Sequence, residues 1–250
     1  MKPSTDVAPG SKPPDTSVQS AAFDTLKRDI IACHKCPRLV AWREEVALTK
    51  RKAYQDWDYW GKPVPGFGDQ KARVLVVGLE PGAHGSNRTG RQFTGDGSGD
   101  FMYPALHRAG FASQPQSTSR EDGLTLHDMY ITAVGRCAPP GNKPTPEELN
   151  NCQPYLECEI ELLNPKVVVA LGRIAFARIL HIYFHKVDLK LQTGIHPAAM
   201  IFGHGAVYKL NTGTWLLCSY HPSQQNTLTG KLTIKMYDQI WKKARKLIDA

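Results

Sequence analysis

Four short runs of apolar residues recur along the chain, each of the length expected for a buried strand. They span residues 73–78, 130–134, 166–172 and 214–220. Continuous apolar runs of this kind are typical of parallel strands that are covered on both faces. We therefore expect four strands in one central, mostly parallel sheet.

Helical patterns lie between and around these runs. The clearest opens at residues 144–148, where Thr145 can cap a helix, Pro146 suits its first turn, and two glutamates face the positive helix end. Other helices are expected at residues 23–31, 99–109, 173–182 and 231–248. Alternating strands and helices predict an α/β fold, here a three-layer α/β/α sandwich around a four-stranded sheet. Ligands bind such sheets beyond the carboxyl ends of the strands, which indicates the loops after Val77, Val134 and Tyr220.

The domain organisation predicted from composition is simple. Residues 1–20 are rich in proline, serine and threonine and read as a disordered tail, and residues 21–250 suit a single domain. Residues 54–69 read as an irregular loop over the surface. No apolar run approaches the roughly 18–20 residues of a membrane helix, and no secretory leader is evident, so we expect a cytoplasmic protein. We also expect a monomer. The net charge of +8 favours phosphate-rich partners, although many basic proteins bind no nucleic acid.

A glycine-rich loop follows the first run. Seven glycines fall between Gly78 and Gly99, interleaved with two arginines, a histidine and an aspartate. Glycine lets backbone amides approach a ligand closely, although a flexible solvated loop is the alternative. The loop lacks the Gly-Lys-Ser/Thr of phosphate-binding loops and the dinucleotide fingerprint. The fourth run leads into a second candidate segment, His221-Pro222-Ser223.

These segments resemble a known family. The segment from Gly78 to Asp100 resembles the first motif of the family 5 uracil-DNA glycosylases, residues 138–146 resemble a middle segment of families 4 and 5, and residues 221–223 resemble the superfamily's His-Pro-Ser motif. The resemblance extends from Cys33 to the C-terminus. It implies a glycosylase-like fold and hydrolysis of the N-glycosidic bond of uracil in DNA, initiating base excision repair. It also implies activity on other deaminated bases such as hypoxanthine, and a nucleoid-associated enzyme with uracil-containing DNA as its partner.

The resemblance assigns the chemistry to two residues. Asp96 would stabilise the cation-like sugar and hold the attacking water, and His221 would donate a hydrogen bond to the leaving base. Asp96 could instead be a turn cap beside Gly95 and Gly97, with Asp100 capping the following helix. Glu80 departs from the family, which usually has alanine there. It could be a second catalytic group, a structural acid, or a neutral change.

Base and DNA contacts follow from the same comparison. A glycosylase must flip its target base out of the duplex, and the flipped base needs a stacking partner and polar contacts to its edge. Phe93 would stack, although a loop phenylalanine can equally be a core anchor. Asn142 would read the edge, although without the resemblance it could equally be a turn residue after Gly141. The amides near Gly82 and Ala83 would add donors. Arg88 and Arg91 would clamp phosphates. The gap in the duplex would be filled by Gln224, Gln225 and Asn226.

Six cysteines suggest a metal site, because thiols in a reducing compartment more often bind metals than form disulfides. Cys33 and Cys36 have the spacing of two ligands to one centre, but a zinc ribbon would need a second such pair. From the residues alone, zinc and iron–sulfur both remain open. The resemblance implies a [4Fe–4S] cluster on Cys33, Cys36, Cys137 and Cys152, with Cys158 outside it and Cys218 as a small buried residue.

Two other functions compete with the glycosylase. One is a non-catalytic DNA-binding module with a cysteine-bound metal site, which would bind DNA without releasing a base. The other is a cofactor-dependent α/β enzyme that holds a nucleotide in the glycine-rich loop, which the missing phosphate motifs disfavour.

Overall fold

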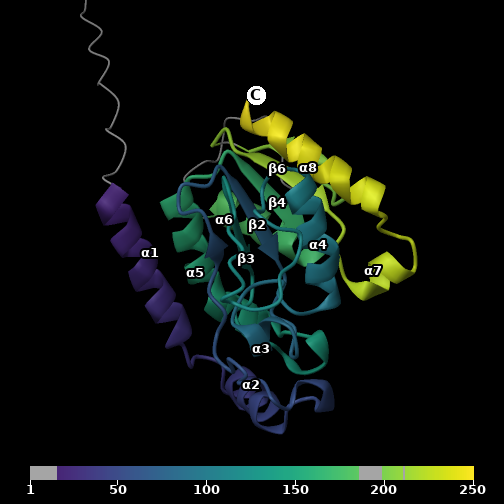
Figure 1. The fold of residues 1–250 in the computed structure, drawn as a ribbon. Coiled ribbons are helices and arrows are strands. Elements are labelled where there is room, and N and C mark those ends of the chain that lie inside the picture. The colour runs from purple at the N-terminus through teal and green to yellow at the C-terminus, as the bar shows by residue number, and fades with distance from the viewer. Residues whose placement is uncertain (1–15, 186–198, 211) are drawn as a thin grey trace, which may run out of the picture.

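The computed structural model describes residues 16–185, 199–210 and 212–250 (Figure 1). Its helices and strands, in chain order, are α1 (Thr16–Ile31), α2 (Pro37–Thr49), η1 (Lys52–Tyr54), β1 (Phe67–Gly68), β2 (Val74–Gly78), α3 (Ser86–Thr89), α4 (Gly97–Arg108), β3 (Met129–Ala133), η2 (Pro140–Asn142), α5 (Pro146–Leu163), β4 (Val167–Leu171), α6 (Arg173–His185), β5 (Val207–Lys209), β6 (Trp215–Ser219), α7 (Gln224–Leu228) and α8 (Ile234–Ile248).

The four apolar runs form the parallel centre of the sheet. The strand order is β1-β3-β2-β4-β6-β5, and Val76 of β2 lies in register between Ile131 of β3 and Val169 of β4. The predicted count of four strands is wrong, because β1 and β5 add one antiparallel edge each. These edge strands have only two and three residues, so they carry no apolar run that marks them in the sequence. β1 also lies within the segment predicted to be an irregular loop.

Alternate residues of the central strands face different helices, which confirms the three-layer sandwich. Val74 and Val76 pack in one core with residues of α4 and α8. Leu75 and Val77 point to the other face and pack with residues of α1, α5 and α6. Figure 1 shows these two helical layers on either side of the sheet. No helix in the described parts of the chain is long and apolar enough to span a membrane.

Helix boundaries confirm some predictions and correct others. Thr145 caps α5 through a reciprocal pair of hydrogen bonds with Glu148, as the sequence indicated. Residues 16–20 belong to α1, so the predicted tail is wrong there, and residues 1–15 lie outside the described residues. The prediction that Asp100 caps a helix is also wrong, since α4 begins earlier and Asp100 lies in its first turn.

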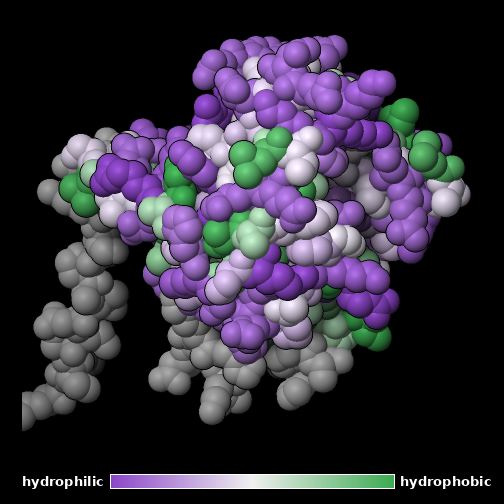
Figure 2. Space-filling view, turned by 90° about the horizontal axis from the view of Figure 1, so that it is seen from below, coloured by the Kyte–Doolittle hydropathy of each residue, from purple (hydrophilic) through white to green (hydrophobic). Residues whose placement is uncertain are grey.

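The parallel strands place their carboxyl ends at one edge of the sheet. The chain passes from β2 to β3 on one side and then to β4 on the other, so the winding direction reverses at β2. Such a reversal leaves a crevice at the strand ends, where α/β proteins bind ligands. This edge lies at the bottom of Figure 1, near α2 and α3. Seen from below, the surface is mostly hydrophilic, with hydrophobic residues in small scattered groups (Figure 2).

Candidate active site

A cavity of about 560 Å³ opens at the carboxyl edge of the sheet, where the loops after β2, β3 and β6 meet. Seven residues predicted from sequence to form the site line it, namely Gly82, Phe93, Asp96, Asn142, His221, Gln224 and Gln225. Its other lining residues include Glu80, Ser86, Gln92, Ser98 and Ser223, of which Glu80 and, as part of the His-Pro-Ser segment, Ser223 were named from sequence. Ala83 is half-buried and does not line the cavity, so its proposed amide contact stays a prediction.

Asp96 is both a helix cap and a cavity residue. Its Oδ1 accepts hydrogen bonds from the backbone N–H groups of Ser98 (3.0 Å) and Gly99 (3.1 Å), which begins α4. Its Oδ2 lies towards Gly82, where a Cβ atom would approach within 3.1 Å. Burial raises the pKa of Asp96, and the two backbone hydrogen bonds oppose that rise by favouring the charged form. The cap therefore fixes one oxygen and leaves the other facing the cavity.

His221 stands at the end of β6 with its ring against Phe93, the ring centroids 5.7 Å apart and the planes tilted by 35°. Burial lowers the pKa of His221 to about 4, so the ring is neutral near pH 7 and carries one N–H donor. The side chain of Asn226 donates to the backbone oxygen of His221 at 2.8 Å. Asn226 does not line the cavity, so in this structure it braces the histidine loop.

Phe93 forms a wall of the cavity in an unusual backbone conformation. Its φ of +52° lies in the left-handed region, which costs a non-glycine residue about 1 kcal/mol. Its ring packs over Gly78, where a Cβ atom would lie 2.7 Å from Cζ. Strain of this kind gathers at functional sites, where surrounding structure holds a residue in place.

Comparison with known proteins identifies the family. The uracil DNA glycosylase superfamily model matches residues 65–245. Type-5 uracil-DNA glycosylases are similar along most of the chain: that of Thermus thermophilus is 52% identical over 225 residues, covering 90% of this chain and 97% of the relative. The type-5 enzyme of Mycobacterium tuberculosis is 50% identical, covering 87% of this chain and 79% of the relative. That of Pyrobaculum aerophilum is 43% identical, covering 89% of this chain and 92% of the relative. The chain belongs to the type 5 uracil-DNA glycosylases. The family resemblance and the glycosylase-like fold expected from sequence are confirmed.

Arg88 does not reach out of this glycosylase towards a phosphate. Its side chain is only 3% exposed and donates to the backbone oxygens of His84 and Gly95, both at 2.8 Å. Its guanidinium also stacks on the rings of Tyr54 and Trp57, at 3.9 and 4.1 Å from their centroids. The predicted phosphate clamp is wrong here, because the side chain is almost fully buried and is held by two backbone oxygens and two aromatic rings.

The surroundings of Arg91 likewise contradict the predicted phosphate contact. It is 2% exposed and forms a two-pronged ion pair with Asp122, with N–O distances of 2.9 and 2.6 Å. It also donates to the hydroxyls of Thr94 (3.0 Å) and Ser117 (2.7 Å). The two arginines of the motif therefore hold the glycine-rich loop in shape from within.

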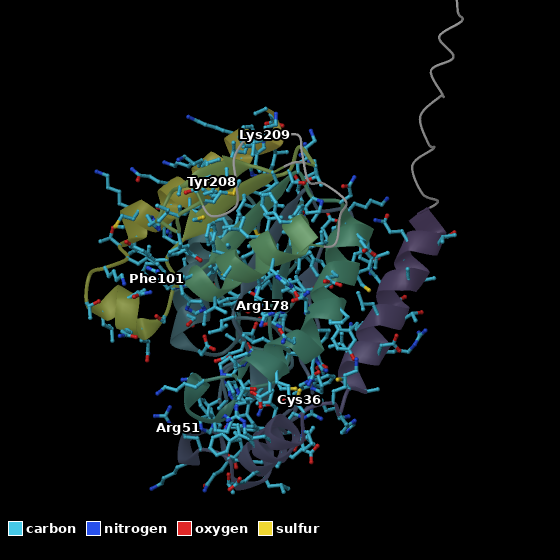
Figure 3. All side chains as sticks on the ribbon, turned by 180° about the vertical axis from the view of Figure 1, so that it is seen from behind. Cys36, Arg51, Phe101, Arg178, Tyr208 and Lys209 are labelled. Atoms are coloured by element: carbon cyan, nitrogen blue, oxygen red, sulfur yellow. The ribbon has the colours of Figure 1, made fainter. Side chains whose placement is uncertain are left out.

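The four cysteines predicted as ligands come from three segments of the glycosylase. Cys33 and Cys36 lie between α1 and α2, Cys137 follows β3, and Cys152 lies in α5; Figure 3 shows Cys36 at the same end as Arg51, opposite Tyr208 and Lys209. The pKa of Cys137 is raised to about 12, mainly by burial and to a smaller extent by Cys152 and Cys33, whereas the neighbouring Arg43 lowers it. Across residues 16–185, 199–210 and 212–250, no three His, Cys, Asp or Glu side chains are close enough to hold a single metal ion.

A buried cation lies beside these thiols. Arg43 is 1% exposed and donates to the sulfur of Cys137 at 3.0 Å and to the backbone oxygen of Cys33 at 3.3 Å. Its nearest carboxylate is that of Glu44 at 3.6 Å, which is half exposed, and its Nε has no partner. A buried guanidinium needs anionic neighbours. Thiolates bound to a metal centre would supply them, so the donor set fits such a group. Cys218, by contrast, is fully buried in β6, as predicted.

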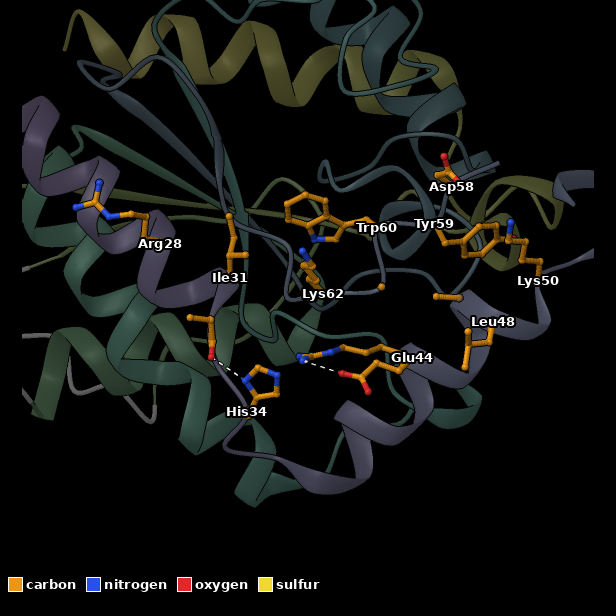
Figure 4. Close-up of a pocket in the computed structure, with 14 residues that line it drawn as sticks. Arg28, Ile31, His34, Glu44, Leu48, Lys50, Asp58, Tyr59, Trp60 and Lys62 are labelled. Atoms are coloured by element: carbon orange, nitrogen blue, oxygen red, sulfur yellow. Dashed lines mark hydrogen bonds and ion pairs between the residues drawn. The ribbon is translucent and has the colours of Figure 1, made fainter. Parts of the chain in front are cut away.

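A larger cavity, of about 840 Å³, lies between the end of α1, α2 and residues 58–62 (Figure 4). None of the predicted base-binding or catalytic residues lines it. In Figure 4 its Glu44 pairs with Arg43, and its His34 bonds to the backbone oxygen of Ala32, so both groups are engaged. The candidate active site is therefore the smaller cavity, which both Asp96 and His221 line.

Proposed function

We propose that this enzyme hydrolyses the N-glycosidic bond of uracil in DNA and so initiates base excision repair. The observation that carries the proposal is that Asp96, His221 and Phe93 line one cavity at the carboxyl edge of the sheet. The names of the type-5 relatives point to the same reaction. The net charge of +8 suits a DNA substrate.

The cavity suits the charges that develop during this reaction. As the bond between sugar and base breaks, the sugar becomes cation-like and the electron pair leaves with the base. The free Oδ2 of Asp96 would stabilise the sugar and orient a water molecule, whose oxygen bonds to the sugar carbon while its proton is released. The neutral ring of His221 would donate its N–H to the base oxygen that gains negative charge.

The remaining lining residues suit recognition of a flipped base. Phe93 offers a ring face for stacking, and Asn142 has an amide with both donors and an acceptor for the base edge. Gln224 and Gln225 are exposed at the mouth of the cavity, where they would enter the gap left in the duplex. A monomeric state and a cytoplasmic, nucleoid-associated location stay predictions.

The activity is tested with a duplex that contains one uracil. The protein is incubated with labelled DNA, the product is treated with alkali, and strand cleavage at the uracil is measured. Cleavage is expected with the uracil duplex and not with a matched thymine duplex. Tight DNA binding without any cleavage would instead support a non-catalytic DNA-binding module.

Activity on other deaminated bases is part of the proposal. A cavity of about 560 Å³ has room for a base larger than uracil, and hypoxanthine carries the same combination of a ring N–H beside a carbonyl. The same assay with a hypoxanthine-containing duplex should therefore also give alkali-sensitive strands. Complete resistance of that duplex, beside cleavage of the uracil duplex, would restrict the enzyme to pyrimidines.

We also propose that Cys33, Cys36, Cys137 and Cys152 hold a [4Fe–4S] cluster. Buried Arg43, which donates to Cys137 and lacks a buried carboxylate, supports a negatively charged occupant. Each thiolate of such a cluster binds a different iron, so the ligands stand farther apart than around one zinc ion. The cluster would tie the α1–α2 junction to the β3 loop and α5. Hydrolysis transfers no electrons, so this role is structural.

Anaerobic purification tests the cluster. The protein should be brown and contain iron, and serine at any of the four positions should bleach it and lower its thermal stability. Cys158→Ser is the matched control, since Cys158 lies in α5 as Cys152 does, and should keep the colour. Zinc without iron in the same preparation would overturn the assignment.

A further inference from the structure

Glu80 is a partly buried residue that lines the cavity with Asp96 and His221, and one oxygen of its carboxyl group has no hydrogen-bond partner in the described parts of the chain. It follows β2 by two residues and lines the same cavity as Asp96 and His221. Within the described chain, its Oε2 is fully shielded from solvent and has no hydrogen-bond partner. Buried polar atoms are rarely left without a partner, and those that are require an explanation. Because Oε2 itself is shielded, a ligand would meet the carboxyl group from the side of Glu80 that faces the cavity, where the residue is partly exposed.

The charged groups around Glu80 form an ion pair with each other. Arg38, the cation whose charge acts on Glu80, donates two hydrogen bonds to Glu148, at 2.8 and 2.7 Å. Burial and the negative charge of Glu148 raise the pKa of Glu80 to about 8, and Arg38 opposes this only in part. The other titratable groups of the cavity are Asp96 and the neutral ring of His221. At neutral pH, Glu80 is therefore mostly a carboxylic acid with an O–H to donate.

A carboxylic acid and a carboxylate recognise opposite chemistry. The neutral form donates to a carbonyl oxygen, whereas the charged form only accepts and repels one. Deamination of cytosine or adenine replaces an amino donor with a carbonyl acceptor. A carbonyl oxygen also has two lone pairs, so it can accept from the Asn142 amide and from a second donor together.

We propose that Glu80, as a neutral acid, is a specificity-determining residue that donates a hydrogen bond to the carbonyl oxygen that deamination leaves on the flipped base. The inference rests on the proposed glycosylase activity, because it assigns a contact to the same site. The ligand class is a nucleobase with an exocyclic carbonyl, such as uracil or hypoxanthine.

Two variants separate this role from a structural one. Glu80→Gln keeps the shape and one N–H donor but cannot ionise, and Glu80→Ala removes the donor. Single-turnover release of uracil from a duplex is measured for both and for the wild type, between about pH 6 and pH 9.5, across the range in which a group with a raised pKa loses its proton. Binding to a duplex with an abasic site, which has no base to contact, serves as the control.

The expected pattern is specific to a neutral donor. The wild-type rate should fall as pH rises above about 8. At neutral pH, the rate of Glu80→Gln should lie within a few-fold of the wild-type rate, and it should not fall at alkaline pH. Below about pH 8, Glu80→Ala should be slower than the wild type by about tenfold or more, as for the loss of one hydrogen bond in a dry site. Above that pH the difference should disappear, because the ionised wild-type side chain no longer donates. All three should bind the abasic duplex equally.

Two results would overturn the proposal. One is an alkaline fall of equal size in wild type and Glu80→Gln, which would assign the ionisation to another group. The other is a full rate in Glu80→Ala, which would mean that the base does not use this side chain. Absence of uracil release by the wild type would defeat the proposed function instead, so the two failures are distinguishable.

Discussion

The carboxylate of Asp96 occupies the space that a side chain on Gly85 would fill. A Cβ atom on Gly85 would overlap Oδ2, Cγ and Cβ of Asp96, so the glycine admits the carboxylate to the cavity. Gly85 lies one residue before α3, on the same loop as the aspartate, and its backbone oxygen accepts from the Thr89 N–H at 3.0 Å. The position of the Asp96 carboxylate thus depends on a residue that lacks a side chain.

Gly85→Ala should therefore displace Asp96 and slow uracil release by roughly 10²-fold, since small misplacements of catalytic groups have effects of this size. Single-turnover kinetics on a uracil duplex provide the measurement. Gly203→Ala is the matched control, because the nearest atom to its added Cβ would lie 3.9 Å away and its rate should be unchanged. A wild-type rate in Gly85→Ala would show that the carboxylate has no fixed place.

Asp96→Asn tests the charge while keeping the cap. Asparagine caps helices about as well as aspartate, so α4 should remain folded. Release of uracil should slow by roughly 10²–10³-fold, the scale expected for one lost electrostatic contact in a transition state. Binding to an abasic duplex should be nearly unchanged. If the variant released uracil at the normal rate, the negative charge would have to come from another residue.

His221 predicts how stability depends on pH. Its pKa is lowered from 6.5 to about 4 by burial, so between these values the unfolded chain binds a proton that the folded chain does not. Stability should therefore fall as pH drops through this range, by roughly 2 kcal/mol from this group at pH 4.5. The free energy of unfolding is measured in urea at pH 6.5 and at pH 4.5. Between these pH values it should fall less in His221→Gln than in the wild type, by the part that His221 contributes. The variant should also release uracil more slowly at neutral pH.

Arg91 should matter for folding and not for DNA affinity. Arg91→Ala leaves Asp122 without its cation, and breaking a buried pair costs about 3–5 kcal/mol. The Tm should fall, whereas the salt dependence of DNA binding should stay the same, because no phosphate contact is lost. If the slope of log affinity against log salt concentration fell by about one unit in Arg91→Ala, Arg91 would have to contact a phosphate.

Periodicity was enough to predict the parallel centre of the sheet and the layers around it. Each central strand is a continuous apolar run because both of its faces are covered, whereas edge strands such as β5 have only partly buried residues and leave no such trace. The Thr145 cap was equally visible, since its hydrogen bonds are local in sequence. The start of α1 could not be predicted from the sequence, because its first residues are mostly polar and their helical state depends on the residues that follow.

The sequence predicted which residues line the candidate site better than it predicted how their side chains are arranged. The motif indicated which loops meet, and Asp96, His221, Phe93 and Asn142 do share a cavity. It did not indicate that Arg88 and Arg91 turn inward, because their partners Trp57 and Asp122 lie about 30 residues away along the chain. Sequence spacing carries no information on such distant pairings. Gln92 was missed for the same reason.

The two inward-facing arginines have a consequence for how damage is found. Arg88 and Arg91 brace the glycine-rich loop from within, through their bonds to Gly95 and Asp122. We therefore expect the loop to keep this shape when DNA binds, so that the duplex bears most of the cost of distortion. That cost is smallest where pairing is already weak. The enzyme should accordingly act as a detector of helix instability, removing uracil faster opposite guanine than opposite adenine.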